Sequence, residues 1–586
     1  MRRQVSALFH SRLRLRTVGR KLPFCAVLAV FATGAGFGAQ KLSPELRSLK
    51  SGRSVEVIVQ YGHTPTGENH RKIAEKGGSL LAELPAIKAA HYAVPASVLR
   101  ELSQDPEIAY ISPNRKLRST SNAPSIPYDY SPQTIGANLA WPLFTGAGVT
   151  VAVVDSGIAS NPDLNDPASG LSRVVYSQNW VSGSDANDYY GHGTHVAGII
   201  AGNAASSTGQ HFDLSISGIA PAANLMNLRV LDQNGESTDS IVIQGLGQVL
   251  ALQAQYRIQV VNLSLGRPAF ESYLQDPLCQ AVEQLWQAGI VVVVAAGNDG
   301  RNDTANTDGY GTINSPGIDP FVITVGCMKT FGDPNRGDDL IASYSSKGPT
   351  LIDRLAKPDI VAPGNQIFSI LDPNSTLETS YPNNVVPITA YAFGCNKKLP
   401  SNYFILSGTS MSAAEVSGAV AVLLQQNPGI SPDTVKARLM LSATKQFPAS
   451  SQVTVNDVTY VDQYDVFTIG AGYLDLTNAL ATAGSVPANQ YAMSPMAQFN
   501  SNGTVTLVNG SNALWGTNAL WGTNALWGTN ALWGTSVFVT GDNALWGTSA
   551  VWGTSTLSGF NALWGTNALW GTSTGDVTES IPVSGE

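Results

Sequence analysis

The sequence predicts an α/β protein whose main domain is a parallel sheet flanked by helices. Short apolar runs of strand length alternate with helix-like segments through the middle of the chain, and this alternation is typical of βαβ units. The strand-like runs are Val149–Val154, Leu225–Leu231, Gln259–Leu263, Ile290–Ala295, Val322–Val325 and Ile360–Val361. Their near-continuous apolar composition indicates strands that are buried on both faces. We expect this domain to span residues 123–485.

Length and charge narrow the class of protein further. The 586 residues suffice for about three or four domains of about 150 residues each. Charged residues make up 13% of the chain and the formal net charge is −8. Nucleic-acid-binding proteins favour clustered positive charge instead, so we expect no nucleic-acid partner.

Residues 1–38 have the composition of an export signal. Basic residues between Arg2 and Lys21 precede an apolar run from Leu22 to Gly38 that ends in small residues. A membrane anchor is the alternative, but the run is short and rich in Gly and Ala for a span of about 20 residues. We therefore predict a secreted, extracellular protein.

Residues 39–122 are predicted to form a small ferredoxin-like α+β unit ahead of the main domain. Strands are expected at Ser54–Tyr61, Ala89–Val94 and Ile108–Ile111, and helices at His70–Lys76 and Ala96–Leu102. The predicted order along this unit is β-α-β-α-β.

The cysteines do not form a disulfide scaffold. Cys25 would leave with the export signal, so Cys279, Cys327 and Cys395 remain and at most one pair can form. No two of the four share a metal-ligand spacing.

Ser410 lies where small residues give way to a helix-forming apolar run, in Ser407-Gly408-Thr409-Ser410-Met411. A hydroxyl at the start of a helix lies near backbone N–H groups that have no intrahelical partner. Those donors would stabilise the oxyanion that a nucleophilic attack generates. A serine N-cap without any chemistry is the alternative.

Two further segments offer an acid and a base. Asp155 ends the apolar run that begins at Val151, and His192 begins the helix-like segment Gly191-His192-Gly193-Thr194-His195. Ligands of open α/β sheets bind outside the carboxyl ends of the strands. An acid, a base and a nucleophile at such ends form the set that acyl transfer needs. Metal binding by His192 and His195 is the alternative, but no third site matches it.

These segments, in the order Asp155, His192, Ser410, resemble the signatures of subtilisin-like serine proteases. The segment Ala295-Ala296-Gly297-Asn298 resembles the family's oxyanion-hole stretch. The resemblance implies that His192 is the general base for Ser410, that Asp155 orients His192, and that Asn298 donates to the oxyanion. It implies no cofactor for the chemistry. For Asn298, a mere turn residue is the alternative.

The resemblance also suggests how an extended peptide would bind by strand addition. Ser264, Leu265 and Gly266 match the family's peptide-pairing edge. Ala295, Ala296 and Gly297 match the opposite wall of the specificity pocket. Gly235, with Glu236 and Ser237, matches a second binding edge. Small residues on these walls suggest broad specificity for protein and peptide substrates.

The sequence departs from the family pattern after Met411. The family usually continues Ala-Ser-Pro-His, whereas this chain continues Ser412-Ala413-Ala414-Glu415. We expect Glu415 to add negative charge near the site. Structural calcium is common in the family, and only Asp163 matches a ligand position clearly.

Residues 39–122 resemble the inhibitory propeptide of the family because of their element order and their position before the catalytic domain. An ordinary extra domain is the alternative. The polar stretch Arg118–Ala123 is the expected cleavage region.

The tail, residues 486–586, repeats the hexamer Asn-Ala-Leu-Trp-Gly-Thr from Asn512 onward. The tryptophans in register are Trp515, Trp521, Trp527, Trp533, Trp546, Trp552, Trp564 and Trp570. The repeats are compatible both with short strands stacked as a sheet or solenoid and with a low-complexity spacer. A row of exposed tryptophans would instead bind a cell-surface or matrix partner. The sequence thus predicts a secreted serine endopeptidase made as a self-processed zymogen, with a catalytically impaired adhesion scaffold as the alternative.

Overall fold

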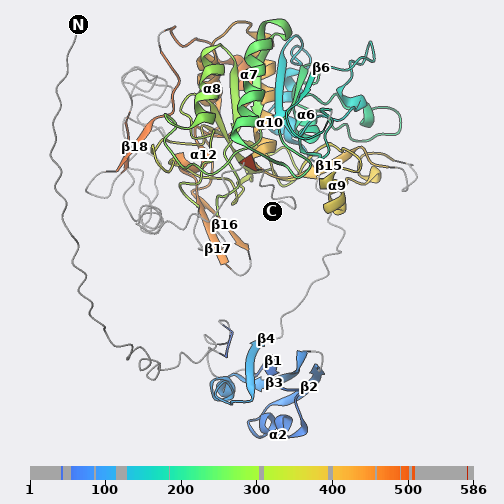
Figure 1. Ribbon diagram of the computed structural model, residues 1–586, viewed down its shortest axis with the longest axis vertical. Helices are drawn as coiled ribbons and strands as arrows, with labels where there is room; N and C mark the ends of the chain where they lie inside the picture. The colour runs from blue at the N-terminus through green and yellow to red at the C-terminus, as the bar shows by residue number, and fades with distance from the viewer. Residues whose placement is uncertain are drawn as a thin grey trace, which may run out of the picture. The chain divides into compact units, whose positions relative to one another are not determined.

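The chain divides into two compact units, Met1–Asn122 and Ala123–Glu586, called unit 1 and unit 2 below (Figure 1). The computed structural model describes residues 41–43, 46, 54–84, 87–113, 129–183, 185–301, 309–393, 400–455, 458–488, 490–499, 505–508 and 577–578. The predicted export signal, the expected cleavage region and the tryptophan repeats lie outside the described residues.

Unit 1 is a four-stranded antiparallel sheet with strand order β2-β3-β1-β4. Its elements are β1 (Ser54–Tyr61), α2 (Gly67–Glu75), β2 (Ser79–Leu84), β3 (Ala89–Pro95), the 3₁₀ turn Ala96–Val98, α3 (Leu99–Leu102) and β4 (Ile108–Pro113). The order β-α-β-β-α-β is that of the ferredoxin-like arrangement. The predicted order β-α-β-α-β is wrong by one strand, because the sequence of β2 does not alternate and its residues lie on the surface.

Unit 2 is built on an eight-stranded sheet with strand order β12-β11-β10-β9-β5-β7-β6, in which β13 also pairs with β11. The strands are β5 (Thr150–Asp155), β6 (Val174–Asn179), β7 (Asn224–Arg229), β9 (Ile258–Leu263), β10 (Val291–Ala295), β11 (Ile323–Lys329), β12 (Leu340–Ile341) and β13 (Ile360–Pro363). All neighbours are parallel except β11 and β12. The predicted parallel sheet is therefore confirmed. The edge strand β6 was missed because it is only half-buried and therefore lacks a continuous apolar run.

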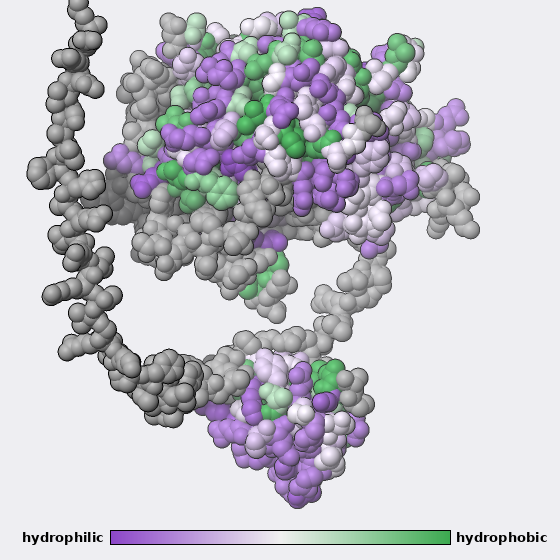
Figure 2. All heavy atoms as spheres, viewed as in Figure 1, coloured by the Kyte–Doolittle hydropathy of each residue, from purple (hydrophilic) through white to green (hydrophobic). Residues whose placement is uncertain are grey.

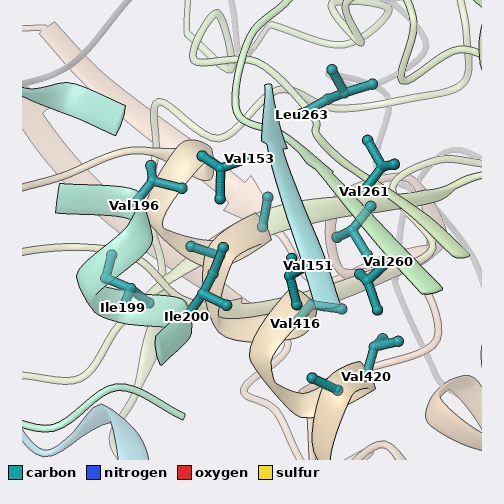
Figure 3. Close-up of a cluster of buried hydrophobic side chains, with 14 of the residues drawn as sticks. Val151, Val153, Val196, Ile199, Ile200, Val260, Val261, Leu263, Val416 and Val420 are labelled. Atoms are coloured by element: carbon teal, nitrogen blue, oxygen red, sulfur yellow. The ribbon is translucent and has the colours of Figure 1, made fainter. Parts of the chain in front are cut away.

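Helices cover both faces of this sheet. Figure 3 shows Val151 and Val153 of β5 beside side chains of α6 (His192–Ala201) and α10 (Thr409–Gln426). The alternate residue Val154 faces α7 (Asp239–Tyr256), where a Cβ added to Gly245 would lie 3.8 Å from it. The helix α8 (Pro277–Gln287) packs beside α7. Because α6 is buried over its whole length and α10 over Thr409–Leu424, both helices consist mostly of small or apolar residues, with His192, His195 and Glu415 as buried exceptions.

Shorter elements surround this core. The helices are α4 (Ser131–Thr134), α5 (Ala137–Ala140), α9 (Thr376–Ser380), α11 (Pro432–Ser442), α12 (Val466–Ile469) and α13 (Leu476–Ala481). Strands pair as β14 (Ile367–Ile370) with β15 (Tyr403–Leu406), β16 (Ser450–Val455) with β17 (Val458–Gln463), β18 (Met496–Phe499) with β19 (Val505–Val508), and β8 (Glu236–Ser237) with β20 (Val577–Thr578).

The surface of unit 2 is mixed in polarity. On the face that Figure 2 displays, hydrophilic side chains surround separate hydrophobic areas. Over the described ranges, none of the helices combines the length and the apolar character that crossing a membrane requires. Cys279 and Cys327 are both buried, and Cys279 is a free thiol.

Candidate active site

Asp155 is the last residue of β5, the strand at which the order of the sheet reverses. From β5 the chain runs to β6 and back to β7 on one side, and only then crosses to β9 on the other side of β5. Such a switch point opens a crevice at the carboxyl ends of the strands. The Asp155 carboxylate is buried, and its Oδ1 accepts hydrogen bonds from the backbone N–H of Ser156 at 2.7 Å and from its hydroxyl at 3.2 Å.

His192 begins α6 and contacts Asp155 directly. Its Nδ1 lies 2.9 Å from Oδ1 and 3.1 Å from Oδ2 of Asp155, and both residues are fully buried. Because a carboxylate only accepts, we assign the hydrogen to Nδ1, which makes Nε2 the basic nitrogen of the neutral ring. The start of α6 approaches the Asp155 loop so closely that a Cβ on Gly193 would lie 2.2 Å from the carbonyl oxygen of Gly157.

Asp188 holds this helix start in place, and the sequence analysis missed it. Its Oδ1 accepts from the backbone N–H of Tyr190 at 3.1 Å and of Gly191 at 2.7 Å, and its Oδ2 accepts from that of Thr194 at 2.8 Å. The hydroxyl of Ser156 also donates to it at 2.9 Å. Burial raises the pKa of Asp188, and the nearby Asp155 adds to this. An acidic residue just before a predicted helix start was the signal for it.

Ser410 is the second residue of α10, which begins after Gly408. Its hydroxyl donates to the carbonyl oxygen of Ser264 at 3.1 Å, and the Ser264 hydroxyl donates to the carbonyl oxygen of Ser410 at 2.8 Å. The amide of Asn262 in turn donates to the Ser264 hydroxyl at 2.9 Å. The buried side chain of Ser264 therefore supports the start of α10, while its carbonyl lies beside the Ser410 hydroxyl.

Asn298 is tied to the residue before Ser410. Its Oδ1 accepts from the backbone N–H of Thr409 at 2.9 Å and from the Thr409 hydroxyl at 3.1 Å. The backbone N–H of Gly297 donates to the same hydroxyl at 3.1 Å. Because a backbone N–H can only donate, the atom facing it must be the amide oxygen. Oδ1 of Asn298 therefore faces Thr409, and the NH₂ group is the donor end of this amide. The sequence analysis did not single out Thr409.

The predicted peptide-binding segments lie next to the strands β9, β10 and β8. Ser264, Leu265 and Gly266 directly follow β9, Ala295 ends β10 and is followed by Ala296 and Gly297, and Gly235 precedes β8. An ion pair links two of these segments, because Arg267 Nη2 lies 2.8 Å from Oδ2 of Asp239. The buried Arg267 was not predicted from the sequence.

His195 is a packed histidine rather than a second base. Its Nε2 lies 3.0 Å from the carbonyl oxygen of Phe404 and 3.2 Å from that of Ile367, so Nε2 carries the hydrogen. Burial, together with the nearby His192, lowers the pKa of His195 to about 3. Within the part of the chain that the structure describes, no cluster of three or more His, Cys, Asp or Glu side chains is arranged to hold a metal ion.

The carboxylate of Asp163, the candidate calcium ligand, is engaged by the chain itself. Its Oδ1 accepts from the backbone N–H of Ser206 at 2.6 Å, and its Oδ2 accepts from the hydroxyl of Tyr403 at 2.7 Å. Calcium binding at Asp163 stays a prediction.

Glu415, which was expected to add negative charge near the site, lies in surroundings that disfavour its charged form. The Glu415 side chain is buried in α10, and burial followed by the nearby Asp129 raises its pKa well above the usual range. The side chain of Ser131 hydrogen-bonds it. Burial thus favours the protonated form of Glu415.

Comparison with known proteins defines the class. Residues 146–469 match the profile of the subtilase family. The chain therefore belongs to the subtilase family, and by that membership it is a subtilisin-like, serine-type endopeptidase.

Individual relatives agree with this membership. The chain is 39% identical over 300 residues to serine protease AprX of Bacillus subtilis (strain 168), and this aligned stretch covers 50% of this chain and 61% of AprX. It is 31% identical over 403 residues to subtilisin E of the same organism, covering 67% of this chain and 87% of subtilisin E. It is 32% identical over 328 residues to thermitase of Thermoactinomyces vulgaris, covering 55% of this chain and 92% of thermitase.

Proposed function

We propose that this chain is a secreted serine endopeptidase that hydrolyses peptide bonds through Asp155, His192, Ser410 and Asn298. The observation that carries the proposal is the contact of 2.9 Å between His192 Nδ1 and Asp155 Oδ1 at the carboxyl end of the sheet. It makes Nε2 the basic nitrogen of His192, and Ser410 supplies a hydroxyl at the start of α10. The chemistry uses these side chains without a cofactor.

The reaction runs in two halves. In the first, His192 Nε2 takes the hydroxyl proton of Ser410 as Oγ bonds to the carbonyl carbon, while Asp155 stabilises the imidazolium. The oxyanion accepts from the backbone N–H of Ser410 and from the NH₂ group of Asn298. The carbon–nitrogen bond then breaks, and His192 returns the proton to the leaving amine. In the second half, water attacks the acyl group, and His192 takes its proton and returns it to Ser410.

The Ser410 hydroxyl must exchange one hydrogen bond for another before attack. It donates to the Ser264 carbonyl at 3.1 Å, and attack requires the hydrogen bond to His192 Nε2 instead. The Ser264 carbonyl is then released to accept a backbone N–H of the bound peptide. Protein and peptide substrates would add a strand along Ser264–Gly266, with Ala295–Gly297 opposite and Gly235 at the second edge.

Unit 1 would serve as an inhibitory propeptide. Its strand β2 and the segment that follows expose Leu80, Leu81 and Ile87, which are 43%, 48% and 55% exposed. An apolar patch of this kind is typical of a surface that is covered by a partner. We propose that cleavage between Arg118 and Ala123 separates it, by the action of Ser410 on its own chain. A Ser410→Ala precursor that is still shortened there would rule out self-cleavage.

Secretion and the tail rest on sequence alone. The basic stretch and apolar run within residues 1–38 support export. The tryptophan repeats from Asn512 would bind a cell-surface or matrix partner. Deleting 512–586 should release the enzyme from cells without abolishing peptidase activity.

Labelling with a fluorophosphonate tests the central proposal. We expect the processed protein to be labelled and to cleave protein substrates, and we expect Ser410→Ala to abolish both. A processed and folded protein that reacts with neither probe would instead support the adhesion scaffold. Sequencing of the N-terminus of secreted material would define the mature chain.

A further inference from the structure

The C-terminal part of the chain supplies a strand to a predicted substrate-binding edge. β20 pairs antiparallel with β8, with Val577 opposite Ser237 and Thr578 opposite Glu236. Figure 1 draws this strand as the short dark-red arrow within unit 2. Among the described strands, β8 pairs with β20 alone. The edge of β8 is thus occupied by backbone from the same chain.

β8 is connected to the candidate active site through the strand end that holds Asp155. The backbone N–H groups of Val230 and Leu231 donate to the Asp155 carbonyl at 2.8 Å and 3.1 Å. The chain then turns, and the backbone N–H of Asp232 donates to the carbonyl of Glu236 at 3.0 Å. Few residues therefore separate the Asp155 contact from β8.

Two further contacts hold β8 beside the site. A Cβ on Gly235 would lie 2.6 Å from the ring of Tyr190, which precedes His192 by two positions. On the other side, the ion pair of 2.8 Å between Arg267 and Asp239 ties the stretch after β8 to the stretch after Gly266. Since Ser264 contacts Ser410 directly, β8 belongs to the walls around Ser410.

The polarity of β20 is that of a chain entering the site. Because the pairing is antiparallel, β20 runs in its N-to-C direction from a position opposite Ser237 to a position opposite Glu236. Continued along β8, that direction leads toward Gly235 and the turn that hydrogen-bonds Asp155. The substrate residues before the scissile bond must likewise run in their N-to-C direction toward Ser410, because their last carbonyl group is the one attacked.

We propose that the segment around Val577–Thr578 binds β8 in the manner of a substrate strand, so that the chain carries its own competitive inhibitor. The inference rests on the proposed peptidase function. A strand edge offers one row of N–H and C=O groups and pairs with one extended chain at a time. The C-terminal segment and a substrate therefore exclude each other from β8.

Proline substitutions in the full chain test the inference. Proline lacks the N–H that strand pairing needs, so the double variant Val577→Pro/Thr578→Pro should free β8. A matched control, Ser584→Pro, changes the same tail outside the pair. Rates are measured on a chromogenic peptide with four residues before the scissile bond, per fluorophosphonate-reactive site. Intact mass verifies that each protein keeps its tail.

We expect the double variant to lower KM by about 5- to 30-fold, the range that one or two net hydrogen bonds supply, with kcat unchanged. The control should retain the KM of the unmodified chain. A synthetic peptide of residues 573–586 should inhibit the double variant competitively, and a scrambled peptide should not. Equal KM values for the three proteins, or no inhibition by the peptide, would overturn the inference while leaving the peptidase intact. A chain without labelling or cleavage in any form would overturn the proposed function, and this inference with it.

Discussion

The bond between Thr409 and Asn298 allows a quantitative test of the proposed oxyanion site. The Thr409 hydroxyl donates to Asn298 Oδ1 at 3.1 Å, and the backbone N–H of Thr409 donates to the same atom at 2.9 Å. Thr409→Val removes the first bond, together with the acceptor that this hydroxyl offers to the backbone N–H of Gly297 at 3.1 Å, and keeps the second bond at nearly constant side-chain volume. The Asn298 amide would then be held by one hydrogen bond instead of two.

The size of the effect follows from that one bond. A neutral hydrogen bond contributes about 0.5–1.5 kcal/mol net, and 1.36 kcal/mol corresponds to a tenfold change in rate. Thr409→Val should therefore lower kcat by about 2- to 12-fold. In subtilisin, removal of the oxyanion-hole asparagine lowers kcat by about 10²–10³-fold, and we expect the same scale for Asn298→Ala. In both variants KM should change little, because the oxyanion exists only in the transition state.

The two substitutions together reveal whether Thr409 acts through Asn298. If it does, Thr409→Val adds little in the Asn298→Ala background, and the double-mutant cycle gives a coupling energy of about 0.5–1.5 kcal/mol. Steady-state kinetics on a peptide substrate, per active site, measure all four proteins. Ser412→Ala is the control, because Ser412 lies on the same helix as Thr409 but its hydroxyl donates to the carbonyl of Ala362 in β13 instead of to Asn298. If the decreases in kcat of the two single variants simply multiply in the double variant, Thr409 does not act through Asn298.

Three further substitutions have defined outcomes. Asp188→Asn presents an NH₂ group where Thr194 N–H needs an acceptor. We expect the free energy of unfolding to fall by about 1–3 kcal/mol, and kcat to fall with KM unchanged. An unaltered kcat and pH–rate profile would contradict a positioning role for Asp188. Burial raises the pKa of Glu415 in the folded chain, whereas in the unfolded chain this carboxyl group loses its proton near pH 4.3. The free energy of unfolding should therefore fall as the pH rises above about 4.3. Glu415→Gln cannot ionise, and its gain in Tm should grow between pH 5 and 8; a gain independent of pH would count against a buried neutral acid. Tyr403→Phe removes the donor to Asp163 Oδ2 and should lower the free energy of unfolding by about 1–3 kcal/mol, as measured by denaturant titration; unchanged stability would show that the bond is replaced by solvent or an ion.

Local patterns predicted most of the sheet and the main site residues. The apolar runs that became β5, β7, β9, β10, β11 and β13 are strands in the structure, because burial on both faces favours apolar side chains at most positions. Edge strands carry no such requirement, which is why β6 and β2 were missed. Asp155, His192 and Ser410 were found because each lies at the end of such a run or the start of a helix.

The supporting contacts could not be predicted in this way. Thr409 lies 111 positions from Asn298 in the sequence, yet its hydroxyl fixes the orientation of that amide. Glu415 reads as a charged residue in the sequence, and only its burial, followed by the nearby Asp129, raises its pKa well above the usual range. Arg267 reads as an ordinary surface cation until its ion pair with Asp239 joins two walls of the site.

The sequence by itself determined which segments are strands and helices, and which side chains carry acid, base and nucleophile chemistry, because these properties depend on residues close together in the chain. Only the tertiary structure decided how those side chains are oriented, which carboxyl groups keep their protons, and which strand occupies β8. Those outcomes depend on burial and on hydrogen bonds between distant segments, such as the pairing of Val577 with Ser237, and no local pattern encodes them.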